Sequence, residues 1–164
     1  MTRVLHLLRH AQSAERQHSQ HDRDRDLTTL GMKEAAIIGH HLKKNDSNID
    51  LVVTSVAKRA QDTASQIHGI LNLNYDVKVV EDLYEASVRT LLSITNQLDD
   101  EYKQVLLVGH NPYLSYFAEY LSRSEVGSMA TCGLATLRFD INSWREVSEG
   151  TATLDNYIYP SMLE

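Results

Sequence analysis

Short apolar runs that alternate with helix-like segments are the feature that most constrains the fold of this chain. Four such runs, at residues 4–8, 51–54, 76–80 and 105–108, have the length and the Val/Leu/Ile content of buried strands. Between them, apolar residues recur at helical spacing over residues 28–45, 55–71 and 88–98, and Thr28 is placed to cap the first helix. After the fourth run, Asn111 is placed to cap a further helix, with Pro112 at its first position. This alternation predicts a parallel sheet with helices on both faces.

The pattern changes from residue 131 onward. Ala135, Leu137 and Phe139 alternate with Thr136 and Arg138, and shorter apolar runs follow at residues 144–147 and 152–154. Such runs are typical of antiparallel edge strands. We therefore predict an α/β fold: a three-layer sandwich with a mostly parallel central sheet, helices on both faces and antiparallel strands near the C-terminus. The 164 residues lack a linker or repeat, so we expect one domain over residues 1–164.

Composition excludes several classes of partner. The net charge of −6 argues against a nucleic-acid-binding surface, which needs a basic face. No apolar run approaches the roughly 18 residues of a membrane span, so no membrane partner is expected. The single cysteine, Cys132, excludes an internal disulfide and a cysteine-rich zinc site, and it suits a reducing cytoplasm. We expect a cytoplasmic protein and favour a monomer.

Cationic and imidazole side chains follow directly after the predicted strands. Arg9 and His10 follow the first strand, Arg59 falls near the first turn of the helix after the second, and His110 follows the fourth. Ligands of open α/β sheets bind outside the carboxyl ends of the strands, so these four residues are expected to meet there. Arginines at a helix N-terminus match the charge and geometry of phosphate. The sequence predicts a pocket for a phosphoryl group.

A histidine in such a pocket can act as a nucleophile. A neutral imidazole nitrogen attacks phosphorus, and the resulting phosphohistidine passes its phosphoryl group to water. Neighbouring cations lower the imidazole pKa and stabilise the charge that develops on the phosphoryl oxygens. Protein cations can supply this charge, so neither a metal nor another cofactor is expected. Neither a His-Glu-x-x-His zinc motif nor a Walker phosphate loop is present.

Four motifs in order resemble the histidine phosphatase superfamily. They are Arg9-His10 after a strand, Ser55-x-x-x-Arg59-Ala-x-x-Thr-Ala, Gly109-His110-Asn-Pro, and, for the small SixA-type phosphohistidine phosphatases, Leu27-Thr-x-x-Gly31. The tail from residue 130 to Trp144 is similar too, so the resemblance spans nearly the whole chain. The resemblance implies that His10 is the phosphorylated nucleophile and that Arg9, Arg59 and His110 form the phosphate pocket.

The resemblance also points to residues around the leaving group. The proton donor of the family lies in the loop after the third strand, where Glu85 is the best match and Glu81 and Asp82 lie close by. Gln12 and Ser13 follow the Arg-His pair and are candidates for further hydrogen bonds to phosphate or substrate.

The short chain suggests what the substrate is. Larger relatives that act on sugar phosphates carry insertions that build a lid, and this chain has little spare length for one. An open site suits phosphohistidine on a partner protein, such as a phosphorelay or phosphotransfer component. We therefore predict a metal-independent, histidine-dependent phosphohydrolase. The alternatives are a hydrolase of small phosphate esters and a phosphate-binding module that has lost turnover.

A second class of phosphatase matches one short pattern. Cys132 and Arg138 have the Cys-x5-Arg spacing of cysteine-dependent phosphatases, whose phosphate loop is tightly curled. The residues between them alternate as in a strand, which would hold the two ends about 20 Å apart at roughly 3.3 Å per residue. We therefore disfavour a cysteine mechanism.

Overall fold

A six-stranded sheet forms the centre of the protein. The structure, a computed structural model, describes residues 1–164. The strands are β1 (Thr2–Arg9), β2 (Leu51–Ser55), β3 (Lys78–Val80), β4 (Gln104–Gly109), β5 (Leu134–Asp140) and β6 (Ala152–Ile158). Their order in the sheet is β3-β2-β4-β1-β5-β6. The first four in this order are parallel, and β5 and β6 run antiparallel to their neighbours. The predicted α/β class is confirmed.

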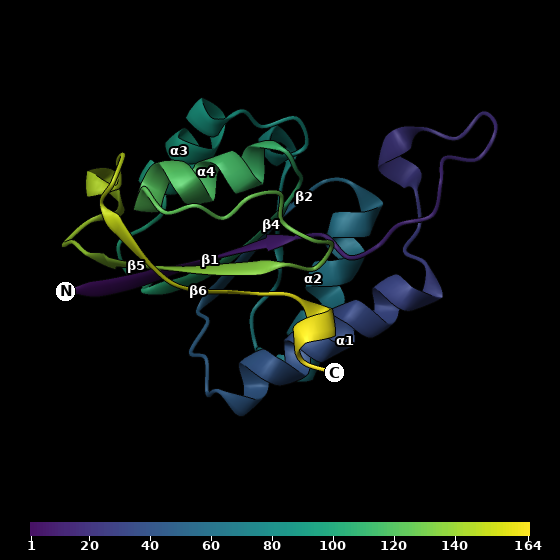
Figure 1. Ribbon diagram of the computed structural model, residues 1–164, viewed down its shortest axis with the longest axis horizontal. Helices are drawn as coiled ribbons and strands as arrows, with labels where there is room; N and C mark the ends of the chain where they lie inside the picture. Colours follow the sequence, from purple (N-terminus) through teal and green to yellow (C-terminus); the bar gives the residue numbers. More distant parts are fainter.

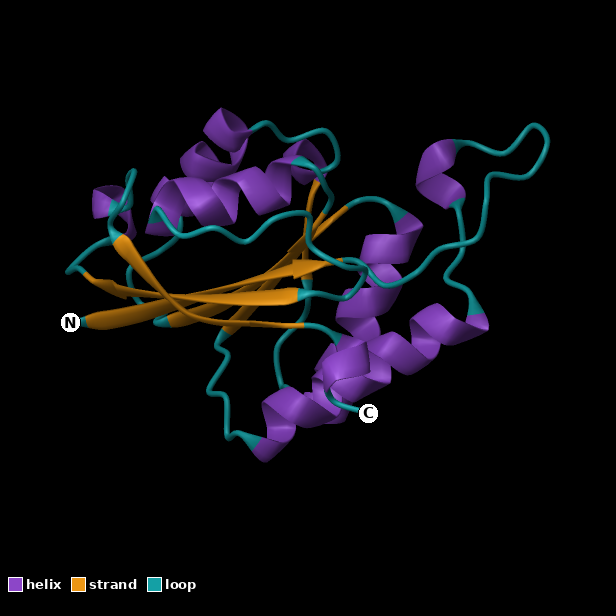
Figure 2. Ribbon diagram, viewed as in Figure 1, coloured by secondary structure: helices purple, strands orange, loops and turns teal.

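Helices cover both faces of the sheet, as predicted. They are α1 (Thr29–Lys44), α2 (Lys58–Leu71), α3 (Val88–Asn96) and α4 (Tyr113–Ser122), with short 3-10 helices η1 (Asp22–Asp24), η2 (Glu81–Leu83), η3 (Trp144–Glu146) and η4 (Pro160–Met162). α3 and α4 lie on one side of the sheet, and α1 and α2 lie on the other (Figures 1 and 2). None of these helices combines the length and apolar content needed to cross a bilayer.

Each face of the sheet buries its own apolar core. Under α3 and α4, the core contains Leu107, Phe117 and Trp144. Under α1 and α2, Ile38 and Ile67 pack against the other face of the sheet. Because successive side chains of a strand point to opposite faces, a strand between two helical layers must be apolar at nearly every position. This explains the continuous apolar runs.

Two local predictions were wrong. Residues 144–147 do not form a strand: Trp144 begins η3, because Ser143 and Glu146 form a reciprocal capping box that favours a helical turn. The helix after β4 begins at Tyr113 with Pro112 at its N-cap, not with Asn111 as cap and proline inside the first turn. The side-chain amide of Asn111 instead donates to the Met129 carbonyl, so it links two loops.

The strand register brings distant residues to one edge. Arg9 at the end of β1 lies opposite Gly109 at the end of β4. Thr54 in β2 lies opposite Val108 in β4, one residue before that end. His10, Ser55 and His110 therefore leave three adjacent parallel strands at nearly the same level. The loop at residues 11–28 projects from this edge, at the right in Figure 1.

Gly31 fixes the start of α1 against the loop that follows His10. Thr28 caps α1 by accepting from the Gly31 amide, as predicted. A Cβ at Gly31 would lie 2.0 Å from the Gln12 backbone oxygen. Gly31→Ala must therefore displace backbone beside the pocket, and we expect it to lower the unfolding free energy by about 2–4 kcal/mol. Urea denaturation measures this loss.

Gly69→Ala is the matched control for Gly31→Ala. Gly69 lies inside α2, and nothing stands within 4 Å of the position that its Cβ would take. Alanine has the higher helix propensity, so this substitution should stabilise the protein by up to about 1 kcal/mol. A Gly31→Ala protein as stable as the wild type would contradict the close approach described here.

Candidate active site

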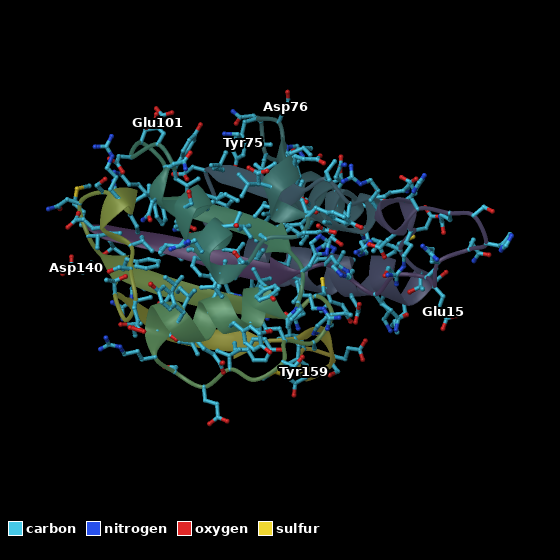
Figure 3. All side chains as sticks on the ribbon, turned by 90° about the horizontal axis from the view of Figure 1, so that it is seen from above. Glu15, Tyr75, Asp76, Glu101, Asp140 and Tyr159 are labelled. Carbon is cyan, nitrogen blue, oxygen red and sulfur yellow. The ribbon has the colours of Figure 1, made fainter.

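A polar cavity lies at the carboxyl ends of β1, β2 and β4. Its volume is about 340 Å³, and its lining contains Arg9, His10, Gln12, Ser13, Arg25, Arg59, His110, Asn111 and Thr131. The structure thus brings together every predicted site residue except Glu85. Figure 3 shows Glu15, in the loop after His10, at the same end of the molecule, and Asp140 at the opposite end.

His10 is buried and held in one orientation. The whole residue is only 8% exposed to solvent. The ring Nδ1 lies 2.7 Å from the Ala11 carbonyl oxygen. Because a carbonyl only accepts hydrogen bonds, Nδ1 carries the proton and Nε2 keeps a free lone pair. The backbone is held as well, since the His10 amide donates to the Gly109 carbonyl and its own carbonyl accepts from the Cys132 amide.

Burial and nearby cations keep both histidines neutral. Burial lowers the pKa of His10 from 6.5 to about 4; the Ala11 carbonyl opposes this, and the guanidiniums of Arg59 and Arg9 reinforce it. Burial likewise lowers the pKa of His110 to about 3, with further contributions from His10 and Arg59. At neutral pH the lone pair of His10 is therefore available for attack on an electrophile.

His110 stands beside His10 and is positioned by a buried serine. The two ring centroids are 5.1 Å apart. The Nε2 of His110 lies 2.7 Å from the Ser55 hydroxyl, which also accepts from the Ala57 amide at the start of α2. The end of β2 thereby fixes the ring of a residue on β4.

Three arginines bring positive charge to the cavity. Arg9 donates from Nη1 to the Met129 carbonyl at 2.8 Å, and its buried Nε has no partner in the protein. Arg59 is only 7% exposed. Arg25, in the loop after β1, donates to the Ser13 hydroxyl at 3.0 Å and to the Ala14 carbonyl at 2.8 Å.

A single carboxylate orients two of these arginines. Asp22 accepts from Arg59 Nη2 and from Arg25 Nη1, each at 3.0 Å, and its backbone carbonyl accepts from Arg59 Nη1 at 2.8 Å. The Tyr84 hydroxyl also donates to this carboxylate. Tyr84, Arg25 and Arg59 together hold the pKa of Asp22 well below its ordinary value, against the effect of burial. The three guanidiniums give the cavity a positive charge, which the Asp22 carboxylate offsets only in part, so the site favours an anionic ligand.

Comparison with known families agrees with this geometry. Residues 5–102 match the family model of the histidine phosphatase superfamily, branch 1. The chain belongs to this superfamily. The matched segment contains β1 with His10, α2 with Arg59 and the loop with Glu85, while His110 lies beyond its end.

Individual relatives extend the similarity to most of the chain. An uncharacterised protein of Mycobacterium tuberculosis is 30% identical over 149 residues, which cover 85% of this chain and 91% of the relative. Phosphohistidine phosphatase SixA of Escherichia coli is 28% identical over 122 residues, covering 73% and 76%. A solved structure of the protein histidine phosphatase SixA with tungstate has a TM-score of 0.81 at 26% identity, covering 98% of this chain and 99% of that chain. The predicted resemblance is confirmed, and the chain is a histidine-dependent phosphatase.

The pKa of His10 has a consequence for the pH profile of this phosphatase. If His10 is the nucleophile, protonation removes the Nε2 lone pair, and activity is lost as pH falls through the pKa of His10. With that pKa at about 4, kcat/KM corrected for substrate ionisation should stay level from neutral pH to about pH 5 and fall below it. Initial rates between pH 3.5 and 8 measure this. A fall centred near pH 6.5 would show that burial and the nearby cations do not lower the pKa of His10.

Glu85 lies outside the polar cavity. It is exposed and lines a neighbouring apolar cavity together with His110 and Asn111. Glu81 instead pairs with Arg23 at 3.0 Å, and the Arg23 guanidinium lies over the Tyr84 ring. Of the three acidic residues near the third strand, Glu85 is thus the one that shares a cavity with a site histidine.

Gln12 and Ser13 line the polar cavity, but both are already engaged in the protein. The Ser13 hydroxyl accepts from Arg25, and the side-chain oxygen of Gln12 accepts from the Thr28 hydroxyl at 2.7 Å. The backbone amide of Gln12 donates to the Glu34 carboxylate at 2.8 Å. The other carboxylate oxygen of Glu34 accepts from Thr131 at 2.8 Å. Glu34 on α1 therefore joins two loops that border the cavity.

The residues of the cysteine-phosphatase pattern lie apart. Arg138 is on β5 and pairs with Asp155 at 3.1 Å. Cys132 is buried before β5, and burial raises the pKa of its thiol well above its ordinary value, which removes the thiolate that a nucleophile needs. No group of three or more His, Cys, Asp or Glu side chains is arranged to hold a metal ion.

Sequence reasoning missed four residues of the site: Asp22, Arg25, Ser55 and Tyr84. Asp22 and Arg25 lie in a segment that looks like a solvated loop because it contains three Asp and three Arg. Their roles depend on where that loop folds, and the sequence does not show this. Arg25 lies two residues before Leu27, the start of the Leu27-Thr-x-x-Gly31 motif, and that was the available signal.

Proposed function

We propose that this protein is a metal-independent phosphatase that removes the phosphoryl group from phosphohistidine on a partner protein, through a phosphorylated His10. The observation that carries this proposal is the free Nε2 of His10 in a cavity lined by three guanidiniums. A single domain over residues 1–164 would carry the whole activity. We also propose a cytoplasmic location, where phosphorelay and phosphotransfer proteins act.

In the first step, His10 takes the phosphoryl group. Its Nε2 forms a P–N bond, the bond between phosphorus and the leaving atom breaks, and the electron pair departs with the leaving group. Arg9, Arg25 and Arg59 stabilise the negative charge on the equatorial oxygens. His110, fixed by Ser55, presents its ring to the same oxygens as a further phosphate contact.

In the second step, water releases phosphate from His10. A water oxygen bonds to phosphorus, the P–N bond to His10 breaks, and Nε2 regains its lone pair. The two protons of the water leave with the product as dihydrogen phosphate. The Ala11 carbonyl holds the Nδ1 proton throughout, so the ring returns to the same tautomer. The charge that a metal supplies in other phosphatases is provided by the three guanidiniums, which is why we propose that no metal is needed.

Two observations support a protein-borne phosphohistidine as the substrate. SixA of Escherichia coli, at 28% identity, and the tungstate-bound SixA structure, at 26%, are named as phosphatases of phosphohistidine and of protein histidine. The polar cavity opens to the surface between two loops, residues 11–28 and 128–133, and no inserted domain covers it. A side chain on another protein can reach such a cavity.

The role of Glu85 depends on the leaving group. We propose that Glu85 protonates alkoxide leaving groups, which need an acid, whereas p-nitrophenolate needs little assistance. Glu85→Gln should therefore lower kcat/KM for an alkyl phosphate by about 10²-fold and for p-nitrophenyl phosphate by less than about fivefold. Parallel assays of the two substrates measure this contrast. Equal effects on both would contradict acid catalysis by Glu85.

The proposed function is tested by phosphate release in excess EDTA. The substrates are a phosphohistidine-bearing carrier protein, p-nitrophenyl phosphate and an alkyl phosphate. We expect the carrier protein to give the highest kcat/KM and EDTA to leave it unchanged. A preference for the alkyl phosphate would favour the small-ester alternative, and inactivity on all three would favour a binding module.

A further inference from the structure

A second cavity adjoins the polar one and has a different chemical character. Its volume is about 240 Å³, and its walls include Leu83, Ala86, Leu91, Pro112 and Tyr113. Leu83 and Leu91 are nearly fully buried, so the floor of this cavity belongs to the core under α3 and α4. We call this space the apolar cavity.

The apolar cavity is continuous with the proposed phosphate site. His110 and Asn111 line both cavities, so the two cavities meet at these residues, and a group bonded to a phosphoryl in the polar cavity can reach the apolar one. Glu85, the proposed proton donor, also lines the apolar cavity. A leaving group must lie beside its proton donor and directly next to the phosphoryl site. The apolar cavity meets both conditions.

Size and lining favour a single flat ring. Pockets for drug-sized ligands have volumes of about 300–1,000 Å³, so a cavity of 240 Å³ suits a smaller group. The Tyr84 ring stands edge-on to the His110 ring with centroids 5.7 Å apart, and Tyr113 forms the outer lip at 46% exposure. Aromatic edges and faces pack well against another ring.

We propose that the apolar cavity binds the imidazole ring of the substrate phosphohistidine and so determines leaving-group specificity; this rests on the proposed function. With the ring in place, Nε2 of His10 bonds to phosphorus as the P–N bond of the substrate breaks. The electron pair of that bond stays on the departing ring nitrogen. The other ring nitrogen keeps its proton, so a neutral imidazole leaves and the acid requirement is small.

A pair of P–N substrates tests the proposal. Free phosphohistidine has an imidazole leaving group, whereas phosphoramidate has only ammonia, which is too small to occupy the apolar cavity. Ala86→Phe fills the cavity from its wall. We expect the ratio of kcat/KM for phosphohistidine to that for phosphoramidate to fall by about tenfold or more in this variant. An unchanged ratio in folded Ala86→Phe would overturn the proposal.

A variant at the exposed lip keeps the test valid if Ala86→Phe does not fold. Tyr113→Ala removes one aromatic wall without disturbing the core, and it should lower the same ratio by about threefold or more. Met162→Ala is the control: Met162 is 53% exposed in η4, outside both cavities, and the ratio for this variant should stay at the wild-type value. Equal ratios in the wild type, in Tyr113→Ala and in the control variant would overturn the proposal.

The same assay distinguishes failure of the imidazole site from failure of the proposed function. If the wild type hydrolyses phosphohistidine and no cavity variant changes the ratio, the proposed function stands and the imidazole site is wrong. If the wild type hydrolyses neither P–N substrate, the imidazole site is wrong, because the cavity would bind the free ring. If it also leaves the phosphohistidine-bearing carrier protein intact, the proposed function fails as well.

Discussion

Replacement of His10 by alanine should abolish phosphatase activity, with kcat reduced by about 10⁴-fold or more. Without the imidazole there is no atom to accept the phosphoryl group, and the guanidiniums alone only bind phosphate. Steady-state phosphate release from a phosphohistidine-bearing protein measures the loss. The alanine should also leave the fold intact, because His10 lies at the edge of the sheet and is not one of the residues that form the two apolar cores.

His18→Ala is the matched control for His10→Ala. His18 is exposed in the loop at residues 11–28 and lines neither the polar nor the apolar cavity. Its replacement should leave kcat/KM within about twofold of the wild type. Full activity of His10→Ala would show that another residue, or a contaminating enzyme, releases the phosphate.

Arg59→Ala is expected to lower kcat/KM by about 10³-fold. Arg59 is a buried guanidinium of the polar cavity, and its removal should take away stabilisation of the transition state. It also leaves the Asp22 carboxylate beside the phosphoryl group with one cation fewer to balance it. Arg59→Lys should lose less, because it keeps the charge but not the forked geometry. Kinetics with p-nitrophenyl phosphate avoid any effect on partner binding.

A double variant separates the two effects of Arg59. In Arg59→Ala/Asp22→Asn the unbalanced carboxylate is gone, so part of the lost activity should return, by about tenfold. Lys58→Ala is the neighbouring control: Lys58 is exposed and pairs with Asp26 and Asp62, outside the cavity. If the double variant is no more active than Arg59→Ala, Asp22 does not act through its charge.

The sheet edge and its four central residues could be predicted because local signals and topology agree. Each apolar run is long enough for a strand, and the first and fourth runs lead within two residues to Arg9-His10 and to His110. Parallel strands then place Arg9, His10 and His110 at one edge, and the helix after β2 adds Arg59. Strand periodicity and helix starts are encoded within short windows of sequence, so they are visible without tertiary information.

The residues that orient this site could not be predicted in the same way. Asp22 contacts Arg59 across 37 positions and Tyr84 across 62. Such contacts depend on how the loop at residues 11–28 folds back over the sheet edge. The error at Trp144 has a different cause: aromatic and valine residues favour strands, but the Ser143–Glu146 capping box outweighs that tendency.

The most direct test of the account is to identify the residue that carries phosphate during turnover. The enzyme is mixed with a phosphohistidine-bearing protein, quenched in alkali within milliseconds to preserve P–N bonds, digested, and examined by mass spectrometry. We predict one phosphorylated peptide, with the phosphate on His10, and none in His10→Ala. Phosphate on His110 or Cys132, or rapid turnover without any phosphorylated enzyme, would contradict the account.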